Sequence, residues 1–180
     1  MAKFNSKQKG GEFERLVCKL LSLWVTDGGK TDVFWRSAMS GGRATVAYKN
    51  SGQRLAAQSG DISAVQAEGN ALISKFFIEC KHYKKLEWEC LLYGGSPELL
   101  KMWNKVVEEA NKFNKLPVML ARQNGREIVM LVRMEDAVML ASYMSCLLPM
   151  CIFPQHNMIV LKFGDFLMNP YKTFEPFLET

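Results

Sequence analysis

Two acids and a lysine in the middle of the chain are of types that could hydrolyse a substrate together. Glu79 and Lys81 follow the apolar run Phe76–Phe77–Ile78, and because strand side chains alternate, both should point to the same face. Asp61 is a second acid upstream. Two close carboxylates repel each other unless a cation relieves them, and their hard oxygens suit Mg²⁺. The lysine could orient the attacking water, help to deprotonate it or offset substrate charge.

A predicted hairpin would bring these residues together. Residues 62–68 and 73–83 read as two strands on either side of a Gly69–Asn70 turn. Antiparallel pairing about that turn would set Asp61 opposite Glu79. The alternative for Glu79 and Lys81 is a surface salt bridge on an edge strand, but charges are rare in an apolar strand without a function or a partner.

Glu14 is the candidate third acid. Apolar residues recur at helical spacing over residues 12–24, which predicts an amphipathic helix that ends at Asp27–Gly28–Gly29. Glu14 lies at the margin of its buried stripe and therefore needs a partner, whereas Glu12 should be solvated. The alternative for Glu14 is a charge near the helix start that complements the helix dipole.

The remaining elements predict an α/β fold with a mixed central sheet flanked by helices. A strand is expected at residues 32–36, followed by a long basic loop over residues 43–60. Ser96 is the expected N-cap of a second helix, with Pro97 in its first turn. Strands 117–122 and 127–132 flank Asn124–Gly125, and residues 158–163 form another strand. We expect one domain over residues 1–180, with a catalytic core at about 10–135 and a hydrophobic C-terminal extension at about 136–180.

Composition excludes some classes of protein. The formal charge of +5 is compatible with a polyanionic partner without demonstrating one. The five cysteines form an odd set with no C-x-x-C pair, and the basic N-terminus does not read as a signal peptide, so we expect a reducing, cytoplasmic protein. The segment from Ala137 to Phe153 has no charge but is too short to favour a membrane span, and it should be a buried helix or one covered by a second subunit.

Four segments in order resemble the archaeal-type Holliday junction resolvases of the PD-(D/E)XK nuclease superfamily: KGGEFERLVCKLL, WRSAMSGGR, Gly60–Asp61 and FFIECK. The resemblance covers about the first half of the chain and implies a restriction-endonuclease-like fold and cleavage of DNA phosphodiesters. It implies Mg²⁺ (or Mn²⁺) held by Glu14, Asp61, Glu79 and the Cys80 backbone carbonyl. Lys81 would assist the attacking water, and Ser40 would lie near the scissile phosphate.

The chain departs from those resolvases in two respects. An extra stretch, roughly Thr45 to Ser59, separates the Ser–Gly loop from Asp61, and the chain is longer. Ser59–Gly60 also precedes Asp61 in place of the proline that names the superfamily. The extra stretch and the greater length could alter the choice of substrate.

Basic residues flank the proposed site and could grip phosphates on either side of the cut. They are Arg36, Arg43, Lys49, Arg54, Lys84 and Lys85. The alternative is ordinary solvated charge. A zinc site of His82, Cys80 and Cys90 is disfavoured because positions 80 and 82 face away from Glu79 and no fourth ligand is evident.

Three functions stay open: a junction resolvase, another PD-(D/E)XK endonuclease that acts on duplex or flap DNA (restriction-like or repair), and a non-catalytic DNA-binding module. A resolvase must cut two opposed strands, so that function predicts a homodimer.

Overall fold

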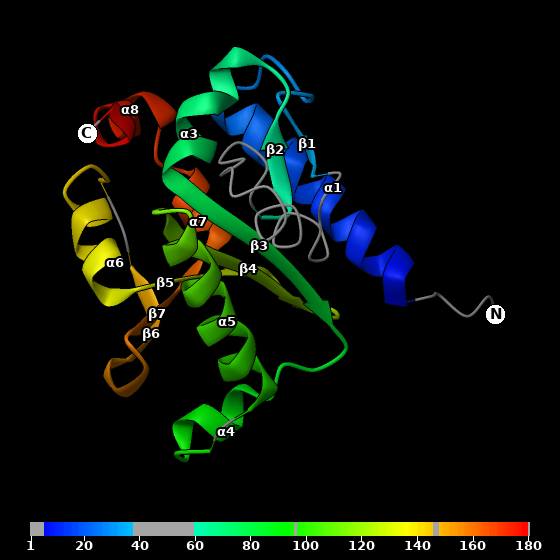
Figure 1. The fold of residues 1–180 in the computed structure, drawn as a ribbon, viewed down its shortest axis with the longest axis vertical. Coiled ribbons are helices and arrows are strands. Elements are labelled where there is room, and N and C mark those ends of the chain that lie inside the picture. The colour runs from blue at the N-terminus through cyan, green and yellow to red at the C-terminus, as the bar shows by residue number, and fades with distance from the viewer. Residues whose placement is uncertain (1–5, 38–59, 96, 146–147, 180) are drawn as a thin grey trace.

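A mixed five-stranded sheet is the centre of the computed structural model, which describes residues 6–37, 60–95, 97–145 and 148–179 (Figure 1). Its strand order is β3-β4-β5-β7-β6. β3 and β4 are parallel, and the other neighbours are antiparallel. The strands are β3 (Phe76–Tyr83), β4 (Leu116–Gln123), β5 (Ile128–Val132), β6 (Pro149–Phe153) and β7 (Met158–Lys162). The predicted α/β class, the hairpin about Asn124–Gly125 and the strand near residue 158 are confirmed.

Helices connect the parallel strands and cover one face of the sheet. α4 (Trp88–Leu92) and α5 (Glu98–Lys112) lie between β3 and β4 in sequence, as a parallel pair requires. α5 buries an apolar stripe that includes Leu99 and Trp103 against this face. Pro97 is the residue before the helix, in extended conformation, so the helix begins one residue later than predicted, and Ser96 lies outside the described residues.

The opposite face is covered by the long helix α1 (Ser6–Val25) with the C-terminal helices α7 (Phe163–Leu167) and α8 (Tyr171–Glu179). The predicted first helix is therefore confirmed. The Trp24 indole N–H donates to the Asn169 carbonyl at 2.7 Å and ties the C-terminal part to α1. Within the ranges that the structure describes, no helix is long and apolar enough to cross a membrane.

A separate two-stranded sheet, called here the β1–β2 hairpin, lies beside β3. β1 (Phe34–Arg36) pairs antiparallel with β2 (Ile62–Ala64), which confirms the predicted strand near residue 34. The Asp61 N–H donates to the Ile78 carbonyl at 2.8 Å, and the Ser37 N–H donates to the Asp61 carbonyl at 2.8 Å. Asp61 is therefore the point at which the hairpin joins β3.

The predicted hairpin between residues 62–68 and 73–83 is wrong. The 3-10 turn η2 (Ala67–Gly69) and the helix α3 (Asn70–Lys75) occupy its middle, and β2 pairs with β1. A helix suits the adjacent apolar pair Leu72 and Ile73 because both are buried, which a strand would not allow on one face. A Cβ on Gly69 would lie 2.7 Å from the Phe34 ring, so this glycine permits close packing.

The predicted single helix over Ala137 to Phe153 is also wrong. Arg133 anchors the start of α6 (Met134–Ala141) through a bond of 2.6 Å from its Nε to Asp136 Oδ2. The helix ends at Ala141, and the last five residues of the segment, Pro149–Phe153, form the edge strand β6. Pro149 disfavours helix both at its own position and at the residue before it, and β7 supplies a strand with which these five residues pair.

Candidate active site

Asp61 is held against the middle of β3 by two backbone contacts. Besides its N–H bond to Ile78, its Oδ2 accepts a hydrogen bond of 2.9 Å from the Cys80 N–H. The residue between these two partners is Glu79. Asp61 therefore lies beside Glu79 as predicted, although the predicted strand pairing is not the cause. Only 6% of Asp61 is exposed.

Gly60 makes this close approach possible. Its φ is +89°, a conformation that L side chains rarely adopt, and a Cβ would lie 2.6 Å from the Ile78 carbonyl oxygen. The glycine is thus required both by its backbone conformation and by its packing on β3. Sequence reasoning gave Gly60 no role of its own, although its place before a candidate acid was a usable signal.

Glu79 and Lys81 project from the same face of β3, as strand alternation predicts. Their neighbours Ile78 and Cys80 are buried in the core on the side of α1. The Lys81 Nζ bonds to Glu79 Oε1 at 2.5 Å, and both side chains are partly exposed. An acid and a base that a substrate can reach therefore stand next to the buried Asp61.

The carboxylates of Asp61 and Glu79 lie close together, and the positive charge around them does not fully compensate them. Burial, with a smaller effect from the Glu79 carboxylate, raises the pKa of Asp61 to about 7. Burial alone would lower the pKa of Lys81, but the charge and hydrogen bond of Glu79 together with the charges of Asp61 and Tyr83 outweigh burial, and the pKa lies above its ordinary value. Lys81 is therefore a cation at neutral pH, and the Asp61 carboxylate would be stabilised by any further positive charge nearby.

Glu14 reaches the site from α1 but is paired. Its Oε2 accepts a hydrogen bond of 2.5 Å from Arg36 Nε, and the guanidinium lies over Gly11, whose Cβ position is 3.1 Å from Arg36 Nη1. Glu14 is close enough to contribute to the raised pKa of Asp61. Sequence reasoning assigned Arg36 to phosphate binding and gave no sign of this pair.

The site contains carboxylate oxygens that could bind a divalent cation, but they do not converge on one point. Among the described residues, no group of three His, Cys, Asp or Glu side chains is arranged to hold a metal ion. Glu79 forms an ion pair with Lys81, and Glu14 forms one with Arg36. The fit of a cation rests on the donor chemistry of Asp61 and Glu79 and on the raised pKa of Asp61.

The other predicted residues are dispersed. Lys84 and Lys85 are exposed directly after β3. Ser40, Arg43, Lys49 and Arg54 lie outside the described residues. Cys80 is buried in the core while Cys90 is exposed on α4, so the structure does not gather the disfavoured zinc set.

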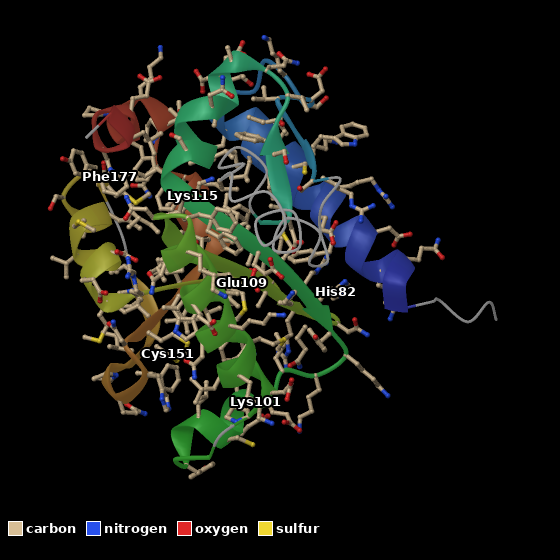
Figure 2. The ribbon with its side chains drawn as sticks, viewed as in Figure 1. His82, Lys101, Glu109, Lys115, Cys151 and Phe177 are labelled. Atoms are coloured by element: carbon tan, nitrogen blue, oxygen red, sulfur yellow. The ribbon has the colours of Figure 1, made fainter. Side chains whose placement is uncertain are left out.

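His82 lies near the end of β3, between that strand and α1 (Figure 2). Its ring is 5.5 Å from that of Phe13 on α1. Its buried Nδ1 has no hydrogen-bond partner in the described part of the chain. The ring therefore belongs to the side of the sheet away from Glu79 and Lys81.

An acid and a lysine at alternate positions of a strand, with a buried aspartate bonded to that strand in a mixed α/β fold, correspond to the PD-(D/E)XK class of nucleases. The family model described as "Phage putative PDDEXK endonuclease" matches residues 5–166, and the chain belongs to this family. No curated protein and no solved structure matches the chain. The family supports the endonuclease class of the superfamily, and the narrower resemblance to archaeal-type junction resolvases stays a prediction.

Proposed function

We propose that this protein is an Mg²⁺-dependent endodeoxyribonuclease that cuts branched DNA, in the manner of a Holliday junction resolvase. The observation that carries the proposal is the position of Asp61. Asp61 is buried and forms hydrogen bonds with the backbone of Ile78 and of Cys80, the two residues that flank Glu79. Cys80 is also the residue before Lys81. A protein gains no stability from a buried acid whose pKa is raised to about 7, so a role in binding a cation accounts for it.

Asp61 and Glu79, with the Cys80 backbone carbonyl, would hold the metal, and Glu14 could join them if Arg36 released it. When bound, Mg²⁺ would activate a water and offset the charge of the phosphate. Lys81 remains protonated beside Glu79, which favours charge stabilisation and orientation of the water over proton removal. Arg36, Lys84 and Lys85, together with Arg43, Lys49, Arg54 and Ser40, would contact the DNA backbone near the cut.

The proposed enzyme is a homodimer that pairs through β6. β6 is an outer strand of the sheet, and Ile152 on it is 49% exposed. Half of the described chain's exposed large apolar side chains lie here: Val138, Met139, Leu148, Met150 and Ile152. Residues 137–153 contain no charge, whereas edge strands are usually protected by charges. A second uncharged β6 would cover this edge by antiparallel pairing about a two-fold axis.

Oligomeric state tests this part of the proposal. Sedimentation should show a dimer for the wild type and a monomer for Ile152→Lys. Met168→Lys is the control, since Met168 is exposed at the end of α7, outside this edge. A monomeric wild type would remove the homodimer from the proposal.

The whole chain would form one nuclease domain, since β7 from its C-terminal part lies between β5 and β6 in the central sheet. We also propose that it works in the cytoplasm. The described cysteines Cys18, Cys80, Cys90 and Cys151 are free thiols, which fits a reducing compartment.

Cleavage of a labelled four-way junction and a linear duplex of matched sequence tests the function, each with Mg²⁺ or EDTA. We expect paired symmetric nicks in the junction that are lost in EDTA and in Glu79→Gln. Glu98→Gln is the matched control because Glu98 forms an exposed ion pair with Lys101 on α5. Equal cutting of the duplex would replace the resolvase by a general or sequence-specific nuclease. Binding without cutting by the wild type would favour a non-catalytic module.

A further inference from the structure

Trp35 is exposed beside the candidate active site. It lies in the middle of β1, and 60% of it is exposed, whereas Trp103 in the core is 1% exposed. The next residue, Arg36, holds Glu14, and the Ser37 N–H bonds to the Asp61 carbonyl. The exposed indole of Trp35 is therefore within two residues of the contacts that hold Glu14 and Asp61.

Trp35 points away from the core that its neighbour Phe34 enters. Phe34 and Ile62 of the hairpin are buried in the same core cluster as Ile78 and Cys80 of β3. Because strand side chains alternate, the residues between them point to the other side. The hairpin joins β3 at Asp61, so β1, β2 and β3 follow one another as neighbours (Figure 1).

Within the described part of the chain, the 60% exposure of Trp35 leaves ring surface open to a flat partner. Ser63 is the small residue paired with it on β2, and Val65 further along is also exposed. An aromatic ring of this kind stacks on a nucleobase, and each such stack contributes about 1–3 kcal/mol. In intact duplex DNA the bases already stack on one another, so only an unpaired base is available for this contact.

We propose that Trp35 stacks on an unpaired nucleobase next to the scissile phosphate and thereby selects DNA with unpaired bases at a branch or single-stranded segment. The inference rests on the proposed nuclease function and names what that site recognises. Because the β1–β2 pair joins β3 at Asp61, a phosphate placed at Asp61, Glu79 and Lys81 would have its adjoining nucleotides beside β1. The positive charge of Lys81 and of the exposed Lys84 and Lys85 suits the backbone of the same strand.

Binding is measured in the Glu79→Gln background, without cleavage, on three DNAs of matched sequence: a four-way junction, a duplex with a single-stranded flap and a fully paired duplex. Each carries 2-aminopurine at the branch or at the equivalent duplex position. Trp35→Ala should weaken binding to the flap DNA, whose single strand has unpaired bases, by about fivefold to a hundredfold, as expected for the loss of one base stack. Its affinity for the paired duplex should not change. Trp35→Phe should keep most of the affinity because it keeps an aromatic face.

Tyr93→Ala is the matched control, since Tyr93 is 88% exposed after α4, an element far from the β1–β2 hairpin (Figure 1). It should change no affinity. Equal binding of all three DNAs by Trp35→Ala and the parent would overturn the inference while cleavage by the wild type would still support the nuclease. An equal loss on branched and paired DNA would also overturn it. If the wild type neither bound nor cut DNA, the proposed function itself would fail.

Discussion

The backbone N–H of Cys80 donates to the carboxylate of Asp61 at 2.9 Å, so the strand that carries Glu79 and Lys81 also holds the buried acid. The acceptor is the short side chain of Asp61, and the donor is a backbone group in the middle of β3. Small backbone changes at this junction should therefore affect stability and cleavage together.

Gly60→Ala should destabilise the protein by about 2–4 kcal/mol and reduce cleavage sharply. The new Cβ would meet the Ile78 carbonyl at 2.6 Å in addition to the unfavourable positive φ. Gly28→Ala is the control because Gly28 has a similar φ of +84° and no atom within 4 Å of a Cβ. Urea unfolding should show that the control loses only about 1 kcal/mol of unfolding free energy. Equal losses in the two variants would mean that the close approach to β3 contributes nothing.

Asp61→Asn should stabilise the metal-free protein at pH 8 and abolish cleavage. The folded-state pKa of about 7 lies above the ordinary 3.8, so the folded protein binds more protons between these values and its stability falls as pH rises through that window. Asparagine removes the charge and keeps an oxygen acceptor for the Cys80 N–H. We expect a gain of roughly 1–3 kcal/mol at pH 8 and none at pH 3.

Thermal unfolding in EDTA at the two pH values measures this gain. Asp32→Asn is the control, because Asp32 is exposed and should give no change at either pH. A variant that is less stable than the wild type at pH 8 would show that the Asp61 charge is already compensated in the metal-free protein.

Lys81→Ala should lower the single-turnover cleavage rate by about 10²- to 10⁴-fold, the usual range for one charge-stabilising group. The melting temperature should fall, because the lysine charge offsets those of Glu79 and Asp61, so the rates are compared at a temperature at which both proteins are folded. Lys112→Ala removes a lysine from an exposed ion pair on α5 and should cut like the wild type. A Lys81→Ala enzyme with the wild-type rate would exclude this lysine from the active site.

Arg36 and Glu14 should be energetically coupled. Their ion pair is partly buried, so removal of the arginine leaves a carboxylate with little solvent. A double-mutant cycle of Arg36→Met and Glu14→Gln should give a coupling of about 1–2 kcal/mol. The exposed Lys101–Glu98 pair, treated in the same way, should give at most about 0.5 kcal/mol. Equal coupling in the two cycles would make Arg36 an ordinary surface charge.

The features that depend only on neighbouring residues in the sequence could be predicted. The shared face of Glu79 and Lys81 follows from strand alternation alone. The helices that became α1 and α5 were predictable because each has an apolar stripe over several turns, and the Asn124–Gly125 turn marks its hairpin directly.

Short apolar segments were not predictable in this way, because their conformation depends on a partner elsewhere in the chain. α3 has six residues, too few for a periodic pattern to distinguish a helix from a strand. β6 is a strand because β7 lies beside it. Asp61 was placed beside Glu79 by the wrong pairing, and the Arg36–Glu14 pair depends on the packing of β1 against α1.

The junction at Asp61 also bears on how the protein folds. Its carboxylate meets β3 only when β2 has docked, and Glu14 arrives only when α1 has packed on the hairpin, so the site depends on contacts between segments far apart in sequence. Such contacts form late because the intervening chain must first lose its conformational entropy. During refolding, helical signal should therefore return before catalytic competence, and a partly synthesised or partly folded chain would carry no complete centre for cutting.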